Sequence, residues 1–379
     1  MVHSVESPLP APTGPYRVSR TSTEVTDPGR PERYGPGVRE LVLWIWYPAD
    51  DAATGGTADY LPPGWAPNVQ LLGLDVAGAR THAVVDGSPS DRAATYPVLL
   101  LSPSGFPPLM LAAFAEELAS HGYVVVGVNH TYETAVTVFA DGRVVPLNPA
   151  AVAGALGPQT GAHEKVFAER AAVCDYKALD LAMVADRLEA LPRLAGRLDL
   201  DRLGALGHSF GGNAVLQWCR SDGRCLAAAN LDGALWTDVG RTGLDRPVLQ
   251  VLAEHREFAV TGEQAVAAGA APDVGWFEAE KEITFGGWRT VQEHGRPGYT
   301  VRVDGATHLS FMDVPFLPAA AASPATAMLA ATTIRPERMW RLTSELLLAF
   351  FGRHLGGAPA PLLDGPSAND PEVRFGPPE

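Results

Sequence analysis

Ser209 stands at the centre of GHSFG, residues 207–211, which fits the pattern G-x-S-x-G. The pentapeptide alone is weak evidence, because glycine is abundant in this chain. Its context is more specific, since RLGALGH before the serine is typical of a strand and GGNAVLQWCR after it is typical of a helix. This is the setting of a nucleophile elbow, a sharp turn that raises a serine hydroxyl above a sheet. Side chains at Gly207 and Gly211 would clash with the adjoining strand and helix.

A serine hydroxyl is a poor nucleophile at neutral pH, so it needs a base and an acid that orients the base. Ten histidines compete for the role of base. His130 and His308 both follow predicted strands, and His308 is favoured because it comes late, as the order serine, acid, histidine of α/β-hydrolases requires. We expect His130 to be a hydrogen-bonded pocket histidine and His208, inside the motif, to point away from the hydroxyl.

Two residues are candidates for the acid. Asp232 ends the predicted strand after the nucleophile, within ANLDGALW, where a carboxylate in an apolar segment is costly unless it has a partner. Glu254 ends the next strand, the position that α/β-hydrolases generally favour, but its charged neighbours also fit a solvated loop. The residues themselves leave both candidates open.

Short apolar runs bounded by turn residues predict strands that are covered on both faces. They are residues 39–49, 96–105, 122–130, 201–209, 225–233, 246–255 and 298–308. Helical patterns between and after them cover residues 109–121, 163–190, 210–220 and 336–354. This alternation predicts one α/β domain over residues 1–379, with a mainly parallel central sheet and helices on both faces.

Long segments without either pattern are expected to be irregular. They are residues 50–95, 131–162, 256–297 and 313–334. Such segments are often functional, and we interpret residues 131–162 and 256–297 as loop or lid insertions. Residues 1–14 and 357–379 contain several prolines and are expected to be flexible tails.

Composition limits the partners of the protein. A formal net charge of -14 disfavours nucleic acids and anionic membranes, because both would repel it. The chain shows no apolar run long enough for a membrane span and no secretory signal, so we expect a cytoplasmic protein. A secreted form whose signal has been removed is the alternative. The sequence does not predict an oligomeric state.

The cysteines Cys174, Cys219 and Cys225 are odd in number, and we expect free thiols in a reducing compartment. A bond between Cys219 and Cys225 across their short loop is the alternative. No H-E-x-x-H sequence and no cluster of cysteine and histidine ligands is present, so neither a metal nor a cofactor is predicted.

Several segments together resemble the platelet-activating factor acetylhydrolase family, and the likeness extends over most of the chain. They are TGPYRVSRT, LVLWIWYPAD, YPVLLLSPSGF, ELASHGYVVVGVNH, RLGALGHSFGG, AANLDGALW and VDGATHLSFMDVPF. In that family the acid follows the strand after the nucleophile, which matches Asp232, 23 residues after Ser209. The resemblance therefore implies a catalytic triad of Ser209, Asp232 and His308 within an α/β-hydrolase fold.

The resemblance also implies an oxyanion hole with two backbone donors. One is the amide of Phe210, and the other belongs to SPSGF, residues 102–106, where this chain lacks the histidine-glycine pair common in the family. Phe106 is the preferred second donor and Gly105 the alternative.

The activity that the resemblance implies is calcium-independent cleavage of carboxylic esters with short acyl chains, through an acyl-enzyme intermediate. The expected partner is a small-molecule ester or lipid-like substrate. A triad does not choose the acyl acceptor or the leaving group, so an acyltransferase or an amide, lactone or polyester hydrolase is one alternative. A non-catalytic binding protein on the same fold is another.

Overall fold

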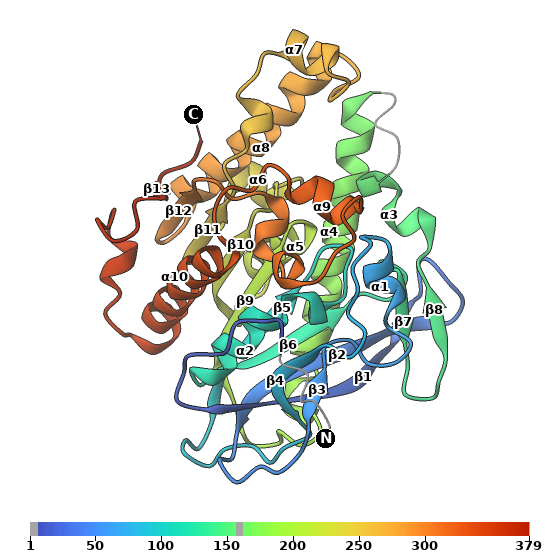
Figure 1. Cartoon of the computed structure of the whole chain (residues 1–379), viewed down its shortest axis with the longest axis vertical. Coiled ribbons are helices and arrows are strands. Elements are labelled where there is room, and N and C mark those ends of the chain that lie inside the picture. The colour runs from blue at the N-terminus through green and yellow to red at the C-terminus, as the bar shows by residue number, and fades with distance from the viewer. Residues whose placement is uncertain (1–6, 157–161, 379) are drawn as a thin grey trace.

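The computed structural model describes residues 7–156 and 162–378 (Figure 1). Within these residues, a central sheet of eleven strands runs through the molecule. In spatial order its strands are β13 (Val373–Phe375), β12 (Gly298–Val303), β11 (Val248–Leu252), β10 (Cys225–Leu231), β9 (Leu198–His208), β5 (Tyr96–Ser102), β6 (Val124–Asn129), β2 (Val38–Ala49), β1 (Arg17–Pro31), β4 (Arg80–Val85) and β3 (Thr57–Asp59). All neighbouring pairs from β6 to β12 are parallel, whereas β2 runs antiparallel to both β1 and β6.

Helices cover both faces of this sheet (Figure 1). One face carries α2 (Ala112–Ser120) and α10 (Pro336–Gly356), and the other carries α4 (His163–Ala185), α5 (Phe210–Ser221), α6 (Asp238–Thr242) and α8 (Val274–His294). Each face of the sheet has its own hydrophobic core. Because side chains of a strand alternate between faces, Leu99 and Leu101 of β5 enter the core beneath α2 and α10, whereas Val98 and Leu100 enter the core on the other face. The predicted fold class, an α/β-hydrolase with a mainly parallel sheet, is confirmed.

Six short helices and strands lie outside the main layers of the described fold. They are α1 (Pro67–Gln70), β7 (Val136–Val138), β8 (Val144–Pro146), α3 (Pro149–Leu156), α7 (Gly262–Ala267) and α9 (Pro324–Leu329). In the predicted insertion 131–162, β7 and β8 pair antiparallel before α3, and residues 157–161 lie outside the described residues. None of the helices in the described part combines the length and the apolar character needed to cross a bilayer.

All the predicted strands are present, but β1, β3, β4, β7, β8 and β13 were not predicted, and the prediction that residues 50–95 are irregular is wrong where β3 and β4 form. The longest of the missed strands is β1. Its sequence, RVSRTSTEVTDPGRP, is polar and its side chains are partly exposed, so no apolar run marks it. A long antiparallel pairing with the buried β2 holds it in the sheet. This is a case in which the partner strand, rather than the strand's own hydrophobicity, determines structure.

The prediction that residues 256–297 are irregular is wrong, because α7 and the 21-residue α8 lie within them. Several glycines and aromatic residues of low helix propensity hide α8 in the sequence. Packing stabilises it instead, since Trp276 and Trp288 are buried. A Cβ at Gly287 would meet Leu235 at 3.1 Å, so this glycine allows α8 to lie close to the segment before α6.

The predicted flexible tails are also wrong where the structure describes them. At the C-terminal end, Ala360, Leu363 and Val373 are buried, and β13 pairs with β12. Near the N-terminus, Leu9 is buried and the Thr13 amide donates to Glu117 Oε2 at 2.7 Å. Residues 1–6 lie outside the described residues.

A disulfide joins Cys219 at the end of α5 to Cys225 at the start of β10. The prediction of free thiols is therefore wrong for this pair, whereas Cys174 is free and buried. The sequence cannot show that the turn between helix and strand brings the two Cα atoms within 5.1 Å. The cytoplasmic location stays a prediction, and the bond weighs against it because reducing compartments keep thiols free.

Candidate active site

The elbow forms where β9 ends at His208 and α5 begins at Phe210. Ser209 between them has φ 59, a backbone conformation that is strained for a residue with a side chain. A Cβ at Gly207 would collide with the Gly211 carbonyl, and a Cβ at Gly211 would collide with the Ser102 carbonyl. The predicted need for both glycines is confirmed.

Asp232 and His308 approach Ser209 from two other strand ends. Asp232 follows β10, and His308 opens the short 3-10 helix His308–Phe311 after β12. Nδ1 of His308 lies 2.7 Å from Oδ2 of Asp232. The carboxylate is fully buried, whereas the His308 side chain is 44% exposed. The structure thus pairs the predicted base with the predicted acid.

All three predicted residues line one hollow of about 200 Å³. Among the described residues the Ser209 hydroxyl has no hydrogen bond to His308. Such loose geometry is common in hydrolases without substrate and tightens when a substrate binds. The arrangement can support nucleophilic attack by Ser209 with His308 as base.

The alternative acid, Glu254, has a different place. Its Oε2 accepts the Gly305 amide at 2.8 Å and pairs with Arg256 at 2.8 Å. It does not line the hollow. Glu254 therefore ties the end of β11 to the loop after β12, and the choice of Asp232 as the acid agrees with the geometry.

His255 is a site residue that the sequence did not reveal. Its Nε2 lies 2.8 Å from Oδ1 of Asp232, and its Nδ1 lies 2.7 Å from Oε1 of Glu257. In the sequence it stands within AEHREF, where charged neighbours suggest a solvated loop. One feature of the sequence could have indicated a role for His255, namely its position just after β11. Parallel strands bring their carboxyl ends to the same edge of a sheet, so His255 and Asp232 end up at the same edge.

The electrostatics of the site centre on Asp232. Burial alone would raise its pKa, but His255 and His308 hold the pKa of Asp232 well below its usual range. The Ala253 amide donates a further hydrogen bond of 2.7 Å to Oδ1. Asp232 is therefore a carboxylate at neutral pH and can keep the proton of the His308 imidazole on Nδ1.

His208 supports the loop that carries His308. Burial and the nearby His308 lower the pKa of His208 to about 3, so its ring is neutral. Nε2 of His208 lies 3.1 Å from the His308 carbonyl oxygen, to which it can donate, and the two ring centroids are 4.5 Å apart. It does not line the hollow. Its contacts indicate a supporting role.

The two predicted oxyanion donors differ in their relation to the hollow, since Phe210 lines it whereas neither Phe106 nor Gly105 does. Phe210 is the first residue of α5. At the N-terminus of a helix the backbone N–H groups lack intrahelical acceptors and the helix dipole has its positive end. Phe106 follows β5 in the loop 102–106 and packs partly buried against the core. Lys177 Nζ donates a hydrogen bond of 3.1 Å to the Ser104 carbonyl and so helps to fix this loop. The choice between Phe106 and Gly105 as second donor stays a prediction.

A buried polar network begins at Ser102, the first residue of the loop 102–106 that carries the predicted second oxyanion donor. Ser102 Oγ is 2.9 Å from Nε2 of His130, and Nδ1 of His130 is 2.7 Å from Oδ2 of Asp180. Arg39 pairs with Asp180 at 2.5 Å. Burial and the charge of Lys177 lower the pKa of His130 to about 3. His130 is hydrogen-bonded, as expected, but it is fully buried rather than part of a pocket wall.

The same network contains a group of potential metal ligands. One ligand atom from each of His130, Glu133 and Asp180 lies within 4.8 Å of the others. However, Lys177 pairs with Glu133 at 2.5 Å, and Arg39 pairs with Asp180. Since these buried cations already balance the carboxylates, the donor set does not favour a metal ion.

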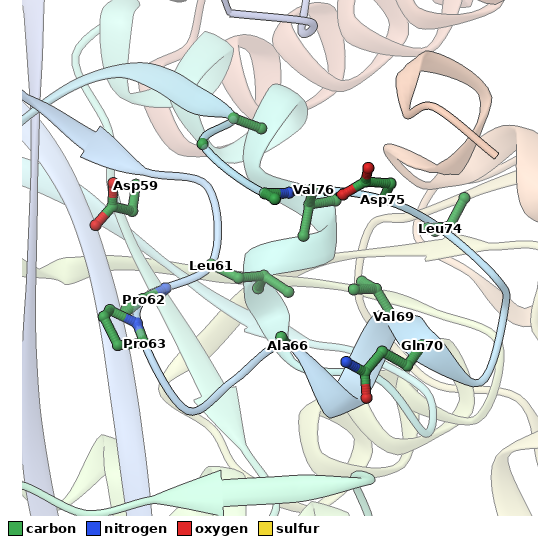
Figure 2. Close-up of a pocket in the computed structure, with 13 residues that line it drawn as sticks. Asp59, Leu61, Pro62, Pro63, Ala66, Val69, Gln70, Leu74, Asp75 and Val76 are labelled. Carbon is green, nitrogen blue, oxygen red and sulfur yellow. Dashed lines mark hydrogen bonds between the residues drawn. The ribbon is translucent and has the colours of Figure 1, made fainter.

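A second hollow, of about 340 Å³, lies among residues 59–79 (Figure 2). Figure 2 shows Leu61, Val69 and Leu74 among the side chains around it. It is lined by no serine, histidine or cysteine, so it offers no nucleophile with a base. The chemistry is therefore assigned to the smaller hollow at Ser209.

The elbow and the convergence of Ser209, Asp232 and His308 on a parallel sheet define the class of α/β-hydrolases. No family model matches the chain. A curated protein of Arthroderma benhamiae, described as a probable 1-alkyl-2-acetylglycerophosphocholine esterase, is 28% identical over 260 residues. This match covers 62% of the present chain and spans 61% of that relative's length.

A solved structure is similar over nearly the whole chain. It is a ferulic acid esterase from Streptomyces cinnamoneus, with a TM-score of 0.76 and 30% sequence identity. The similarity covers 96% of this chain and 98% of that one. The chain therefore belongs with the esterases of the α/β-hydrolase class. The name of the curated relative agrees with the resemblance predicted from the sequence motifs.

Proposed function

We propose that this protein is a serine hydrolase that cleaves carboxylic esters with short acyl chains through an acyl-enzyme intermediate. The observation that carries the proposal is the His308–Asp232 pair, which lies with Ser209 around one hollow at the nucleophile elbow. Both similar proteins are named as esterases, which supports the same reaction class.

In the proposed mechanism, Ser209 Oγ attacks the ester carbonyl carbon while His308 Nε2 accepts the hydroxyl proton. Asp232 orients the imidazole and stabilises its charge, and the amides of Phe210 and Phe106 donate to the oxyanion. Collapse of the tetrahedral intermediate expels the alcohol, which takes the proton from His308. Water, deprotonated by His308, then attacks the acyl-enzyme carbonyl carbon. The bond to Ser209 Oγ breaks, Ser209 takes the proton back from His308, and the carboxylic acid is released.

The size of the hollow supports a small acyl group. Its volume of about 200 Å³ is below the ~300–1,000 Å³ of pockets that hold drug-sized ligands. Trp236, Phe258 and Trp288 supply apolar walls. Glu280 at the same hollow pairs with Arg170, and Glu257 pairs with His255. A small ester, or a lipid-like ester with a short reacting chain, fits these walls better than a long acyl chain.

A chain-length series tests this function. p-Nitrophenyl esters of two to twelve carbons, with a phospholipid carrying an acetyl second chain beside them, would be hydrolysed by the wild type and by Ser209→Ala. We expect kcat/KM to fall steadily with chain length, and a burst of p-nitrophenolate where deacylation is slow. Absence of hydrolysis by the folded wild type, or equal rates for Ser209→Ala, would contradict the proposal.

Product analysis separates hydrolysis from acyl transfer. The reaction would be run with added alcohols and amines, and the acid, ester and amide products quantified. We expect free acid as the main product, because the half-exposed His308 leaves room for water as acceptor. Dominant ester or amide formation at low acceptor concentration would favour an acyltransferase instead.

A further inference from the structure

Asp232 has two imidazole partners, of which the proposed mechanism uses only one. His308 contacts Oδ2 at 2.7 Å and His255 contacts Oδ1 at 2.8 Å. The two histidines come from different strand ends, His308 after β12 and His255 after β11. The carboxylate therefore lies between two imidazoles, one on each oxygen.

We propose that His255 is a positioning residue of this site: an imidazolium held between Asp232 and Glu257 that fixes the Asp232 carboxylate for His308 and takes up part of its negative charge. The inference rests on the proposed function, because it concerns the same triad. His255 itself contacts neither the Ser209 hydroxyl nor another reacting atom in the proposed mechanism.

The hydrogen bonds of His255 indicate its charge. Both ring nitrogens face carboxylate oxygens at 2.7 and 2.8 Å. A neutral imidazole has a single N–H, so one nitrogen lone pair would face a carboxylate lone pair. A protonated ring donates to both. Burial opposes this charge, but Asp232 and Glu257 raise the pKa of His255 to about 10.

The surroundings hold this ring in place. Its side chain is 11% exposed, and its centroid lies 4.8 Å from that of Trp288 on α8. Its backbone has φ 55, a left-handed conformation that is unfavourable for a residue with a side chain. A strained backbone, a ring packed at a tilt against Trp288 and two carboxylate partners together fix one orientation of His255.

Other charged groups share the hollow with His255. Besides Asp232 and His308, these are Glu257 and Glu280, and Arg170 on α4, which pairs with Glu280 at 2.8 Å. The Glu257 side chain is 61% exposed, so solvent screens its attraction. Asp232 is fully buried and is therefore the partner to which the charge of His255 couples most strongly.

The consequence concerns the proton on His308. When His308 accepts the serine proton, it becomes a second imidazolium on the same carboxylate. A charged His255 already balances part of the Asp232 charge, so less of that charge acts on His308. Without His255 the undivided charge of Asp232 would act on His308 alone, and we expect activity to be lost at a higher pH.

The test compares pH profiles of kcat/KM for the wild type, His255→Gln, His255→Phe and the control His294→Gln. Glutamine keeps a donor without the charge, and phenylalanine keeps the ring beside Trp288 without either. His294 is exposed at the end of α8, and among the residues that the structure describes its ring bonds the Thr290 carbonyl alone. The acid limb of the profile is the pH range in which kcat/KM falls as the pH is lowered. We expect this limb to move to higher pH by roughly one unit in both His255 variants, which is a tenfold loss of kcat/KM at pH values below the limb.

The control should keep the wild-type limb. Phenylalanine should also lower kcat at pH 8, because the carboxylate loses a hydrogen-bond donor, whereas glutamine should retain more of it. A fall in rate or in melting temperature without movement of the acid limb in either variant would show a merely structural role and overturn the proposal.

A spectroscopic measurement covers the case in which the variants fail to fold or the protein hydrolyses no ester. Wild-type protein with ¹⁵N-labelled histidine would be examined by NMR from pH 6 to 9, using loss of signals in His255→Gln, or proximity to Trp288, for assignment. We expect both ring nitrogens of His255 to stay protonated throughout. A neutral His255 at pH 7 would overturn the proposal whether or not the esterase function stands.

Discussion

The described residues contain two sets of serine, histidine and aspartate, and in each set the histidine bonds the aspartate. In the buried set, Ser102 bonds His130, which bonds Asp180 at 2.7 Å. In the set at the elbow, His308 bonds Asp232 at 2.7 Å. By hydrogen bonding alone the buried set is the more complete. We assign catalysis to the other set.

Charge and access distinguish them. Asp180 is neutralised by Arg39, and burial with Lys177 lowers the pKa of His130 to about 3, so this ring does not take up a proton at neutral pH. Asp232 has imidazole partners instead, and its His308 is 44% exposed beside a hollow. A reactive triad therefore needs a base that can gain a proton and a serine that a substrate can reach.

The largest expected contrast is between the two histidines. His308→Gln removes the base and should lower kcat/KM by roughly 10⁴-fold or more. His130→Gln should leave kcat/KM per folded molecule within about tenfold, because that ring stands behind the loop. Ester hydrolysis at 25 °C, with the folded fraction measured by circular dichroism, compares them. Equal losses of activity would remove the distinction between the two sets.

Substitution of Asp232 should change the rate of turnover, whereas substitution of Asp180 should change the stability of the fold. Asp232→Asn should reduce kcat by ~10⁴-fold, because the wrong tautomer of His308 would be favoured. Asp180→Asn should instead lower the free energy of unfolding by about 3–5 kcal/mol, since the buried Arg39 loses its main partner. Kinetics and urea unfolding of both variants provide the measurement. An inactive but fully stable Asp180→Asn would contradict the assignment.

The pH dependence of stability should have opposite signs at His130 and His255. The pKa of His130 is about 3 in the folded protein and 6.5 ordinarily, so the unfolded chain binds the extra proton and this contribution falls as pH drops below 6.5. The pKa of His255 is about 10, so its contribution is complete below 6.5 and is lost as pH rises through 10.

Urea unfolding of the wild type, His130→Gln and His255→Gln from pH 5 to 9 would measure these signs. We expect the advantage of the wild type over His130→Gln to shrink as the pH falls. Its advantage over His255→Gln should shrink as the pH rises. Parallel pH curves for the three proteins would mean that neither ring has a shifted pKa.

The smallest expected effect is at the disulfide. Replacing both Cys219 and Cys225 by serine should lower the free energy of unfolding by roughly 2 kcal/mol, because the bond closes a short loop in the unfolded chain. Turnover at 25 °C should not change, since neither residue lines the hollow. Urea unfolding and ester hydrolysis would be measured together. A large loss of turnover would show that the bond also positions the elbow.

The sequence predicted the parts of the site that local pattern controls. The elbow at Ser209 follows from glycines that the turn requires, and the strands that deliver Asp232 and His308 are short apolar runs. His255 could not be recognised in this way, because only the order of strands in the folded sheet brings it to Asp232. The same holds for α8, whose helix depends on packing rather than on propensity.

The most direct measurement is to locate the serine that reacts with a fluorophosphonate. The native protein would be labelled at neutral pH, digested, and the modified peptide identified by mass spectrometry, with Ser209→Ala and Ser102→Ala treated in the same way. The account predicts a single adduct on Ser209, absent from Ser209→Ala and retained in Ser102→Ala. An adduct on Ser102, or no adduct on the folded wild type, would contradict it.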